Sequence, residues 1–192
     1  MRKVHNMKKL VRPIYSARNI LSFDLLYHGS DAEVKVPELG KNTIARKDFG
    51  YGFYCTNIKE QAERWAKKKG SGNGVVSIYT WNPGAMNSLK CLEFKSIAEE
   101  KDLNLWLNEI IRNRHKDSIS HDFDIIAGPM ADDYVWYSVQ DYIEAKNRGL
   151  DLEPYFEKVK QDALGFDYHT QQIVFCTQRA IDVLKFESSY EI

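Results

Sequence analysis

The sequence predicts an α+β protein whose strands are largely antiparallel. Short apolar runs bounded by turn residues, such as "FDLLYHGS" and "VVSIYTW", are typical of buried strands. Longer segments with apolar residues every three or four positions, such as "NIKEQAERWAKKKG", indicate amphipathic helices. The two kinds of segment do not alternate in regular βαβ units, which argues against a doubly wound parallel sheet.

The first predicted strand ends in "LLYHGSD". Residues 25–27 are its apolar end, and residues 29–31 form the turn that stops it. His28 is therefore expected at the mouth of a strand. A histidine in such a place either bonds to nearby backbone or faces a ligand, and the surrounding seven residues do not distinguish the two.

An aromatic block, "DFGYGFYCT", follows a basic pair at Arg46 and Lys47. Alternation along a strand would send Tyr51 and Phe53 to one face and Tyr54 to the other. The glycines between these aromatic residues allow either a ligand or a neighbouring strand to come close.

A helix is predicted directly after this block. Asn57 and Glu60 have the spacing of a capping box, and Gly70 ends the helix. Its apolar face consists of Ile58, Ala62, Trp65 and Ala66. The glycine-rich residues 70–74 that follow have no GK[ST] sequence, so a connection is favoured over a phosphate-binding loop.

The second half of the chain predicts four strands and three helices. Ser96 and Glu99 have capping spacing before a helix whose inner face includes Leu103 and Trp106. The next helix begins at "ADD", where Asp132 and Asp133 favour the helix dipole, and Gly149 ends it. Another helix begins near Pro154. The strands are expected in "LKCLEF", "HDFDIIAGP", "TQQIVFCT" and "VLKFES".

Composition indicates one domain of ordinary soluble type, with 43% hydrophobic and 28% charged residues among 192. Residues 24–192 form this domain, and residues 1–23 form a basic extension. The first twenty residues carry six basic residues and no acid, which leaves the rest with a net charge of −6. Such an arm could dock internally, touch nucleic acid or only keep the chain soluble.

The cysteines and the lack of long apolar stretches favour a reducing, cytoplasmic compartment. No stretch has the length of a membrane span or a signal peptide, so no membrane partner is expected. The three cysteines are odd in number and widely spaced, which suggests neither a disulfide framework nor a CxxC zinc site. They are Cys55, Cys91 and Cys176.

No standard metal site or nucleophile motif is found. His115 and His121 are six residues apart, and the acids around them do not have a metal-ligand spacing, so we expect no metal. GxSxG and a Rossmann glycine pattern are also missing from the sequence.

Four blocks taken together resemble a known family. "YHGS", "DFGYGFYCTNIKEQAERWA", "DIIAGPMADD" and "QQIVF" resemble, in order and local pattern, the ADP-ribosyltransferases of the His-Tyr-Glu type, which include the diphtheria-toxin-like and poly(ADP-ribose) polymerase groups. Their wording is most similar to an uncharacterised bacterial family assigned to that fold, often encoded beside a small antitoxin. The resemblance covers roughly residues 24–186. It implies a split antiparallel β-sandwich with flanking helices.

The resemblance also implies a role for each matching residue, with NAD as the co-substrate. His28 would bond a ribose hydroxyl of the adenosine, with help from Ser30. Gly29 would offer its backbone to the nicotinamide amide. Tyr54 would stack on the nicotinamide, and Trp65 would supply a second aromatic ring, although core packing explains Trp65 equally well.

The late residue of the triad departs from the pattern, because Gln172 stands where the family has an acid. Glutamine bonds a ribose hydroxyl but supplies no negative charge. This favours an acceptor with its own nucleophile, a nucleic-acid or small-molecule acceptor, or slow NAD hydrolysis. Gln171 would point to the opposite face of the strand. Arg46 and Lys47 would meet the phosphates of NAD, or form a solvated pair.

The first functional hypothesis is therefore an NAD-dependent ADP-ribosyltransferase, the toxin of a bacterial toxin and antitoxin pair. It would transfer ADP-ribose to a protein or nucleic-acid acceptor and release nicotinamide. One alternative is an NAD glycohydrolase that depletes NAD. Another is a catalytically silent module that binds a nucleotide or a partner.

Overall fold

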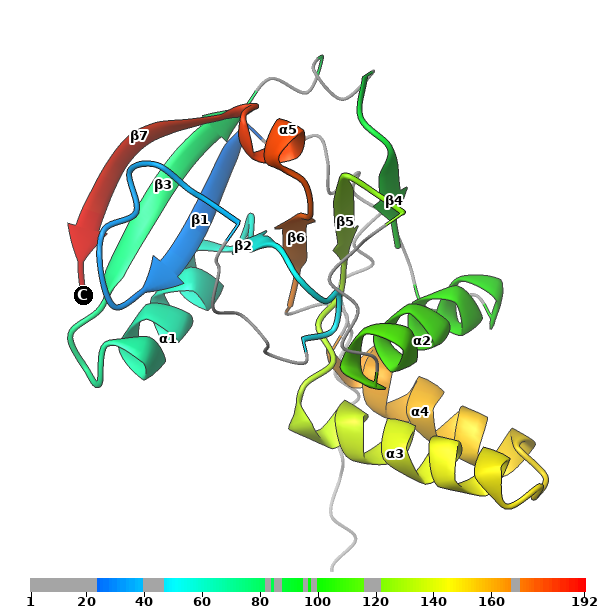
Figure 1. Ribbon diagram of the computed structural model, residues 1–192. Helices are drawn as coiled ribbons and strands as arrows, with labels where there is room; N and C mark the ends of the chain where they lie inside the picture. The colour runs from blue at the N-terminus through cyan, green and yellow to red at the C-terminus, as the bar shows by residue number, and fades with distance from the viewer. Residues whose placement is uncertain are drawn as a thin grey trace, which may run out of the picture.

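The structure, a computed structural model, describes residues 24–39, 47–81, 84, 88–94, 97, 100–115, 122–166 and 170–192. Helices and strands are mixed, and the strands form two separate sheets, which confirms the predicted α+β class (Figure 1). The basic extension, Arg46, the capping pair Ser96 and Glu99, and His121 lie outside the described residues, as does the side chain of His115.

The first sheet has three antiparallel strands in the order β1-β3-β7. One helix, α1, packs on its outer face, where Ala62 and Ala66 contact Val76. Figure 1 shows α1 lying beside β1 and β3. The elements of this part are β1 (Leu25–Ser30), α1 (Lys59–Lys69), β3 (Val75–Trp81) and β7 (Leu184–Glu191).

The second sheet has four strands in the order β2-β6-β5-β4, of which only β4 and β5 run parallel. Helices α2, α3 and α4 lie together on the side away from the first sheet (Figure 1). The elements are β2 (Phe53–Cys55), β4 (Cys91–Glu93), α2 (Glu100–His115), β5 (Ile125–Gly128), α3 (Asp133–Asn147), α4 (Glu153–Phe166), β6 (Gln172–Phe175) and α5 (Gln178–Ile181).

Two apolar cores lie on opposite faces of the second sheet, because successive strand residues point to opposite sides. Phe175 and Ile173 face the first sheet and pack with its Leu26 and Tyr79. Val174 faces the helices instead. The second sheet is therefore buried on both faces.

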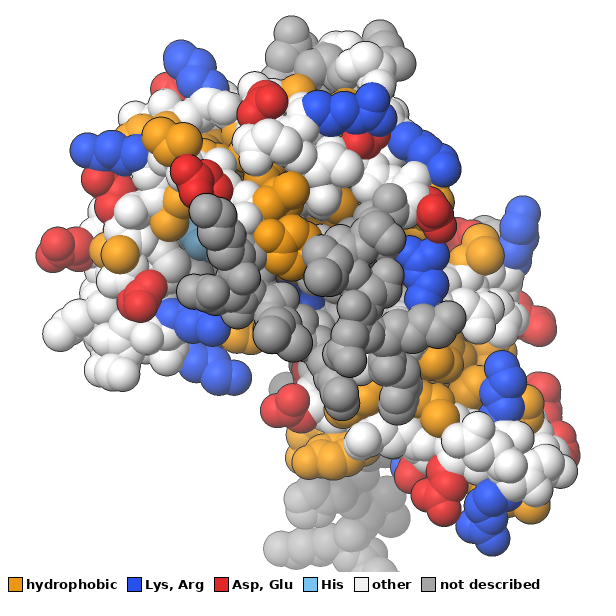
Figure 2. All heavy atoms as spheres, in the orientation of Figure 1, with side chains coloured by type: hydrophobic (Ala, Val, Ile, Leu, Met, Phe, Trp, Pro, Cys, Tyr) orange, Lys and Arg blue, Asp and Glu red, His pale blue; other side chains and the backbone are white. Residues whose placement is uncertain are grey.

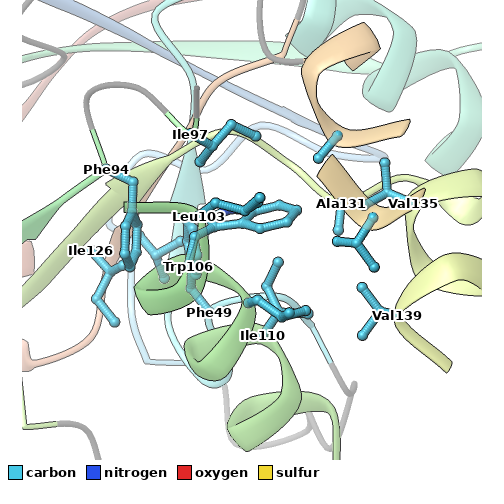
Figure 3. Packing of buried hydrophobic residues seen from close by; sticks show 14 of the residues in the cluster. Phe49, Phe94, Ile97, Leu103, Trp106, Ile110, Ile126, Ala131, Val135 and Val139 are labelled. Atoms are coloured by element: carbon cyan, nitrogen blue, oxygen red, sulfur yellow. The ribbon is translucent and has the colours of Figure 1, made fainter. Parts of the chain in front are cut away.

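The helical core is centred on α2. Trp106 is fully buried, and its indole nitrogen donates to the carbonyl oxygen of Pro129 at 3.1 Å. Leu103 and Ile110 share its face of the helix, as predicted, and Figure 3 shows Val135 and Val139 of α3 beside this group. This packing fixes the segment between β5 and α3 relative to the sheets.

Several local predictions are confirmed. Asp132 caps α3 by accepting the amide hydrogen of Val135 at 2.9 Å. Gly149 follows the same helix with a φ of 66°, a left-handed conformation that glycine adopts without a Cβ clash. Pro154 lies in the first turn of α4. None of the helices in the described part of the chain is long and apolar enough to cross a membrane.

Two local predictions are wrong. β1 continues through Ser30, so His28 lies within the strand rather than at its mouth. The capping box is not formed, because α1 begins at Lys59 after Ile58, and Asn57 Oδ1 is buried without a hydrogen-bond partner among the described residues. The hydroxyl oxygen of Thr56 accepts the Ile58 amide hydrogen at 3.1 Å instead.

The aromatic block forms a shorter strand than its pattern predicts. Only Phe53–Cys55 pair as β2, and Tyr51 lies in the preceding bend. Gly52 allows a neighbouring strand to approach, since a Cβ there would lie 2.5 Å from Val174 Cγ1. Tyr54 does point away from Phe53, toward the helical core.

Candidate functional site

A cavity of about 390 Å³ lies where the two sheets part. Tyr27 and Thr56 join β1 to the end of β2 by two backbone hydrogen bonds of 2.8 and 2.9 Å, in an isolated bridge. The cavity lies beside this bridge, between α1 and the segment from Met130 to Asp133. Residues from the first sheet, the second sheet, α1 and α2 line it, among them His28, Gly29, Lys47, Asp48, Tyr54, Trp65, Arg114 and Gln172.

His28 spans the opening between the sheets. Its Nδ1 lies 2.7 Å from the Tyr54 carbonyl oxygen, which only accepts, so Nδ1 carries the hydrogen. Its ring stacks on Phe53 with centroids 4.4 Å apart. Burial is the main cause that lowers the pKa of His28, and the nearby Lys47 lowers it further, against the bond to Tyr54. The neutral ring therefore keeps Nε2 as a hydrogen-bond acceptor.

The backbone of Gly29 is oriented by the sheet. In an antiparallel strand, the N–H and C=O groups of residues two apart point to the same side. Those of Tyr27 bond to Thr56, so those of Gly29 point away from β3, toward the cavity that Gly29 lines. Gly29 is also required by packing, because a Cβ there would lie 2.0 Å from the Ala62 carbonyl oxygen of α1.

Tyr54 is held at both ends. Its hydroxyl donates to the Gly50 carbonyl oxygen at 2.7 Å, and its own carbonyl accepts from His28. Burial raises the pKa of the Tyr54 phenol, and Asp48 raises it further, so the hydroxyl remains a donor. The ammonium group of Lys47 lies 4.3 Å from the ring centroid.

Trp65 and three lysines form the α1 side of the cavity. Trp65 is half-buried and is not part of the apolar core, and Lys68 Nζ lies 5.1 Å from the centroid of one of its rings. Lys69 and Lys47 line the same cavity. Burial, and then the charge of Lys69, lowers the pKa of Lys47. This side therefore offers an aromatic surface and cations whose charged form an anionic ligand would stabilise.

The opposite side is built around Asp48, which is 3% exposed. Arg114 Nε donates to Asp48 Oδ1 at 2.7 Å, and the Ala131 amide donates to Oδ2 at 2.8 Å. Arg114 also donates to the Ala131 carbonyl oxygen at 2.8 Å and lies 4.3 Å from the ring centroid of Trp136. Burial raises the pKa of Asp48, and the Arg114 charge opposes this rise.

Gln172, 6% exposed, is the first residue of β6. Its Nε2 donates to Asp48 Oδ2 at 3.0 Å and to the Pro129 carbonyl oxygen at 3.4 Å. The neighbouring Gln171 does not line the cavity. Its backbone instead pairs with the side chain of Gln61 on α1, through Gln61 Nε2 to Gln171 O at 2.7 Å and Gln171 N to Gln61 Oε1 at 2.9 Å.

The cavity brings together six of the eight residues singled out from the sequence, which are His28, Gly29, Lys47, Tyr54, Trp65 and Gln172. Ser30 is not among its lining residues, and its hydroxyl donates to the Ala32 carbonyl oxygen at 2.5 Å. Arg46 lies outside the described residues, whereas its neighbour Lys47 lines the cavity.

Sequence reasoning missed Asp48 and Arg114. Asp48 begins the aromatic block, and nothing in its sequence neighbourhood indicates a distant charged partner. Arg114 is 66 residues away on a helix, and no local pattern pairs the two. A buried charge pair of this kind is found only when the fold is known.

The arrangement suits a ligand with hydroxyl groups, a flat ring and negative charge. His28 and Gln172 provide acceptors, Trp65 an aromatic surface and Lys47 a cation. On the face shown in Figure 2, basic and acidic side chains are interspersed over the surface. Within the described ranges, no group of His, Cys, Asp and Glu could hold a metal ion.

The fold and the cavity define a two-sheet α+β protein with a cavity where its two sheets part. The profile of a family described as "Protein of unknown function (DUF3990)" matches residues 25–186, so the chain belongs to this family. Comparisons with curated proteins and with solved structures find no match.

Proposed function

We propose that the protein is an NAD-dependent ADP-ribosyltransferase with an ADP-ribosyltransferase-like fold. One observation carries this proposal: His28, Tyr54 and Gln172, taken from three distant blocks of the sequence, line one cavity. The chemistry breaks the bond between nicotinamide and ribose, which requires a fixed leaving ring and support for positive charge on the sugar.

Each side of the cavity fits one part of NAD. Gly29 presents backbone groups suited to the nicotinamide amide, and Tyr54 and Trp65 provide aromatic rings. His28 Nε2 accepts a ribose hydroxyl. Lys47, Lys68 and Lys69 provide positive charge for the diphosphate. The volume, about 390 Å³, is in the range of ligand pockets, roughly 300 to 1,000 Å³.

Release of nicotinamide from NAD tests the proposal. His28→Ala and Gln172→Ala are expected to lower the rate by at least about 100-fold, the size of effect seen when one transition-state contact is removed. Tyr54→Ala should act in the same direction. Gln178→Ala and Tyr137→Ala, at exposed positions outside the cavity, are the matched controls. Unchanged release in all three cavity variants would contradict the proposed site.

The destination of the label identifies the acceptor. NAD labelled in its ADP-ribose part is incubated with separate protein and nucleic-acid fractions of a cell extract. Label on either fraction supports transfer. Free ADP-ribose in stoichiometric yield, with neither fraction labelled, would identify an NAD glycohydrolase instead. This alternative is specific to the chain because position 172 has a glutamine and not a carboxylate. Saturable NAD binding without turnover would indicate a silent binding module.

The resemblance further supports a toxin role with a cognate antitoxin. Induced expression in bacteria is expected to stop growth, and His28→Ala should restore it. Arrested growth that persists with His28→Ala at equal protein level would contradict a toxin role for this cavity.

A further inference from the structure

A carboxylate lies one hydrogen bond away from the glutamine that replaces the acid of the His-Tyr-Glu pattern. Asp48 Oδ2 is 3.0 Å from Gln172 Nε2. The two residues are 124 positions apart and both line the cavity. The charge that Gln172 lacks is therefore present beside it.

The contacts of Asp48 fix its charge state and its position. Arg114 Nε, the Ala131 amide and Gln172 Nε2 all donate to its two oxygens. A protonated carboxyl would place its own O–H donor among these three donors, where no acceptor is available for it. The ionised carboxylate accepts all three hydrogen bonds, so these contacts favour the ionised form. Arg114 is held in turn by the Ala131 carbonyl and the Trp136 ring.

The contacts of Gln172 fix the orientation of its amide. Its two neighbours on the Nε2 side, the Asp48 carboxylate and the Pro129 carbonyl, are acceptors only. Rotation of the amide by half a turn would set Oε1 against both of them, which is unfavourable. Nε2 is therefore committed to the protein, and Oε1 is the atom free to accept a hydrogen bond from a ligand.

We propose that Asp48 is the positioning residue for Gln172: it locks the amide so that Oε1 accepts a ribose hydroxyl of NAD, and it supplies the negative charge behind that amide. This inference rests on the proposed function. In the resembling family one acid both contacts the ribose and supplies the negative charge. Here these two tasks are divided between Gln172 and Asp48, so NAD cleavage depends on Asp48 through Gln172.

The short contact between Asp48 and Gln172 has a consequence for Gln172→Glu, which would restore the acid of the resembling family. Gln172→Glu alone would set a second carboxylate about 3 Å from Asp48, and two carboxylates this close share one proton. With that proton, the pair reproduces the native donor and acceptor pattern. Without it, the two charges repel. Activity of Gln172→Glu should therefore fall as pH rises, although the variant restores the acid of the family.

Four proteins test the inference by nicotinamide release between pH 6 and 9: wild type, Asp48→Asn, Gln172→Glu and the double variant. Asp48→Asn should lower kcat on the order of 10- to 100-fold, as for outer groups that orient a metal ligand. The double variant removes the second carboxylate and should lose the added pH dependence of Gln172→Glu. It should stay slower than wild type, because the single amide atom in place of Asp48 Oδ2 cannot both donate to a carboxylate at position 172 and accept from the Ala131 amide.

The charged and titratable groups around the pair are the same in all four proteins. They are Arg114 on α2, Tyr54 on β2, His28 on β1, Lys47 beside Asp48, Lys68 and Lys69 on α1, and Asp132 and Asp133 at the start of α3. Differences between the profiles therefore report the exchanged pair. The exposed pair on α5, where Gln178 Nε2 donates to Asp182 Oδ1 at 2.9 Å, is the matched control. Gln178→Glu should leave the profile unchanged.

Two further measurements separate positioning from a loss of folding. Asp48→Asn leaves Arg114 without its counter-charge, so Asp48→Asn combined with Arg114→Gln removes both charges together. This combined variant should fold, and its release of nicotinamide should remain slower than that of the wild type. The side-chain amide resonance of Gln172 in ¹⁵N spectra at pH 8 should shift in Asp48→Asn, independent of any turnover.

The outcomes are distinct. A double variant as fast as wild type, or Gln172→Glu as active as wild type at pH 8, would overturn the positioning role. A wild-type protein that neither cleaves nor binds NAD would overturn the proposed function and the ribose contact with it. An unshifted Gln172 amide in Asp48→Asn would overturn the lock itself.

Discussion

Replacing Asp124 by asparagine is expected to lower the free energy of unfolding by about 2 kcal/mol at neutral pH. Asp124 is 3% exposed and lies just before β5. Its oxygens accept from the Lys90 amide at 2.8 Å, the Thr177 hydroxyl at 2.6 Å and the Arg179 guanidinium. The carboxylate thereby ties the start of β4 to α5.

The magnitude follows from the pKa. Hydrogen bonds from Arg179, and then from Thr177 and the Lys90 amide, lower the pKa of Asp124 from 3.8 to about 2, against burial. Each unit corresponds to about 1.4 kcal/mol, so the ionised form stabilises the fold by about 2 kcal/mol. For a chain of this length the expected loss in Tm is about 5 °C.

The sign of the pH dependence is set by the direction of the shift. Because the folded-state pKa lies below the unfolded value, the contribution is complete above about pH 5 and is lost as pH falls toward 2. Urea unfolding of wild type and Asp124→Asn at pH 7, 5, 4 and 3 measures it. Asp122→Asn, at a carboxylate that is 71% exposed and 3.1 Å from Arg112, is the control and should change stability by less than about 1 kcal/mol. A difference that stays the same from pH 7 to pH 3 would refute the reasoning.

Three other outcomes are expected. Gly29→Ala should lower stability by about 1 to 3 kcal/mol in thermal unfolding and weaken NAD binding, because its Cβ would displace α1; an unchanged Tm would contradict the close packing. Lys47→Gln should weaken NAD binding roughly tenfold and flatten its salt dependence in calorimetry, and an unchanged Kd would remove Lys47 from the phosphate site. Burial raises the pKa of all three thiols, but Cys55 and Cys176 are buried whereas Cys91 is half-buried, so a thiol reagent should label Cys91 first and the other two only on unfolding. Equal labelling of all three in the native protein would disagree with the described burial.

The secondary structure was predictable where local chemistry decides it. The helix with Leu103 and Trp106 on its inner face and the cap at Asp132 follow from apolar period and side-chain reach. Element ends were less predictable. Gly29 looked like a turn residue, but α1 packs over it, and the strand continues because glycine permits that contact.

The lining of the cavity was predictable in part for a similar reason. His28, Tyr54 and Gln172 each belong to a block with a recognisable order, and all three line the cavity. Asp48 and Arg114 carry no such local mark. Their roles arise only from contacts across the fold, which spacing along the chain does not encode.

Two hydrogen bonds between the Gln61 side chain and the Gln171 backbone link α1 to the start of β6 beside the cavity. The Gln61 side chain accepts from the Gln171 N–H and donates to the Gln171 C=O. This is the pattern of paired hydrogen bonds that joins neighbouring strands of a sheet. The helix that carries Trp65 is therefore hydrogen-bonded directly to the residue next to Gln172. A substitution that shortens the Gln61 side chain would remove both of these hydrogen bonds at once.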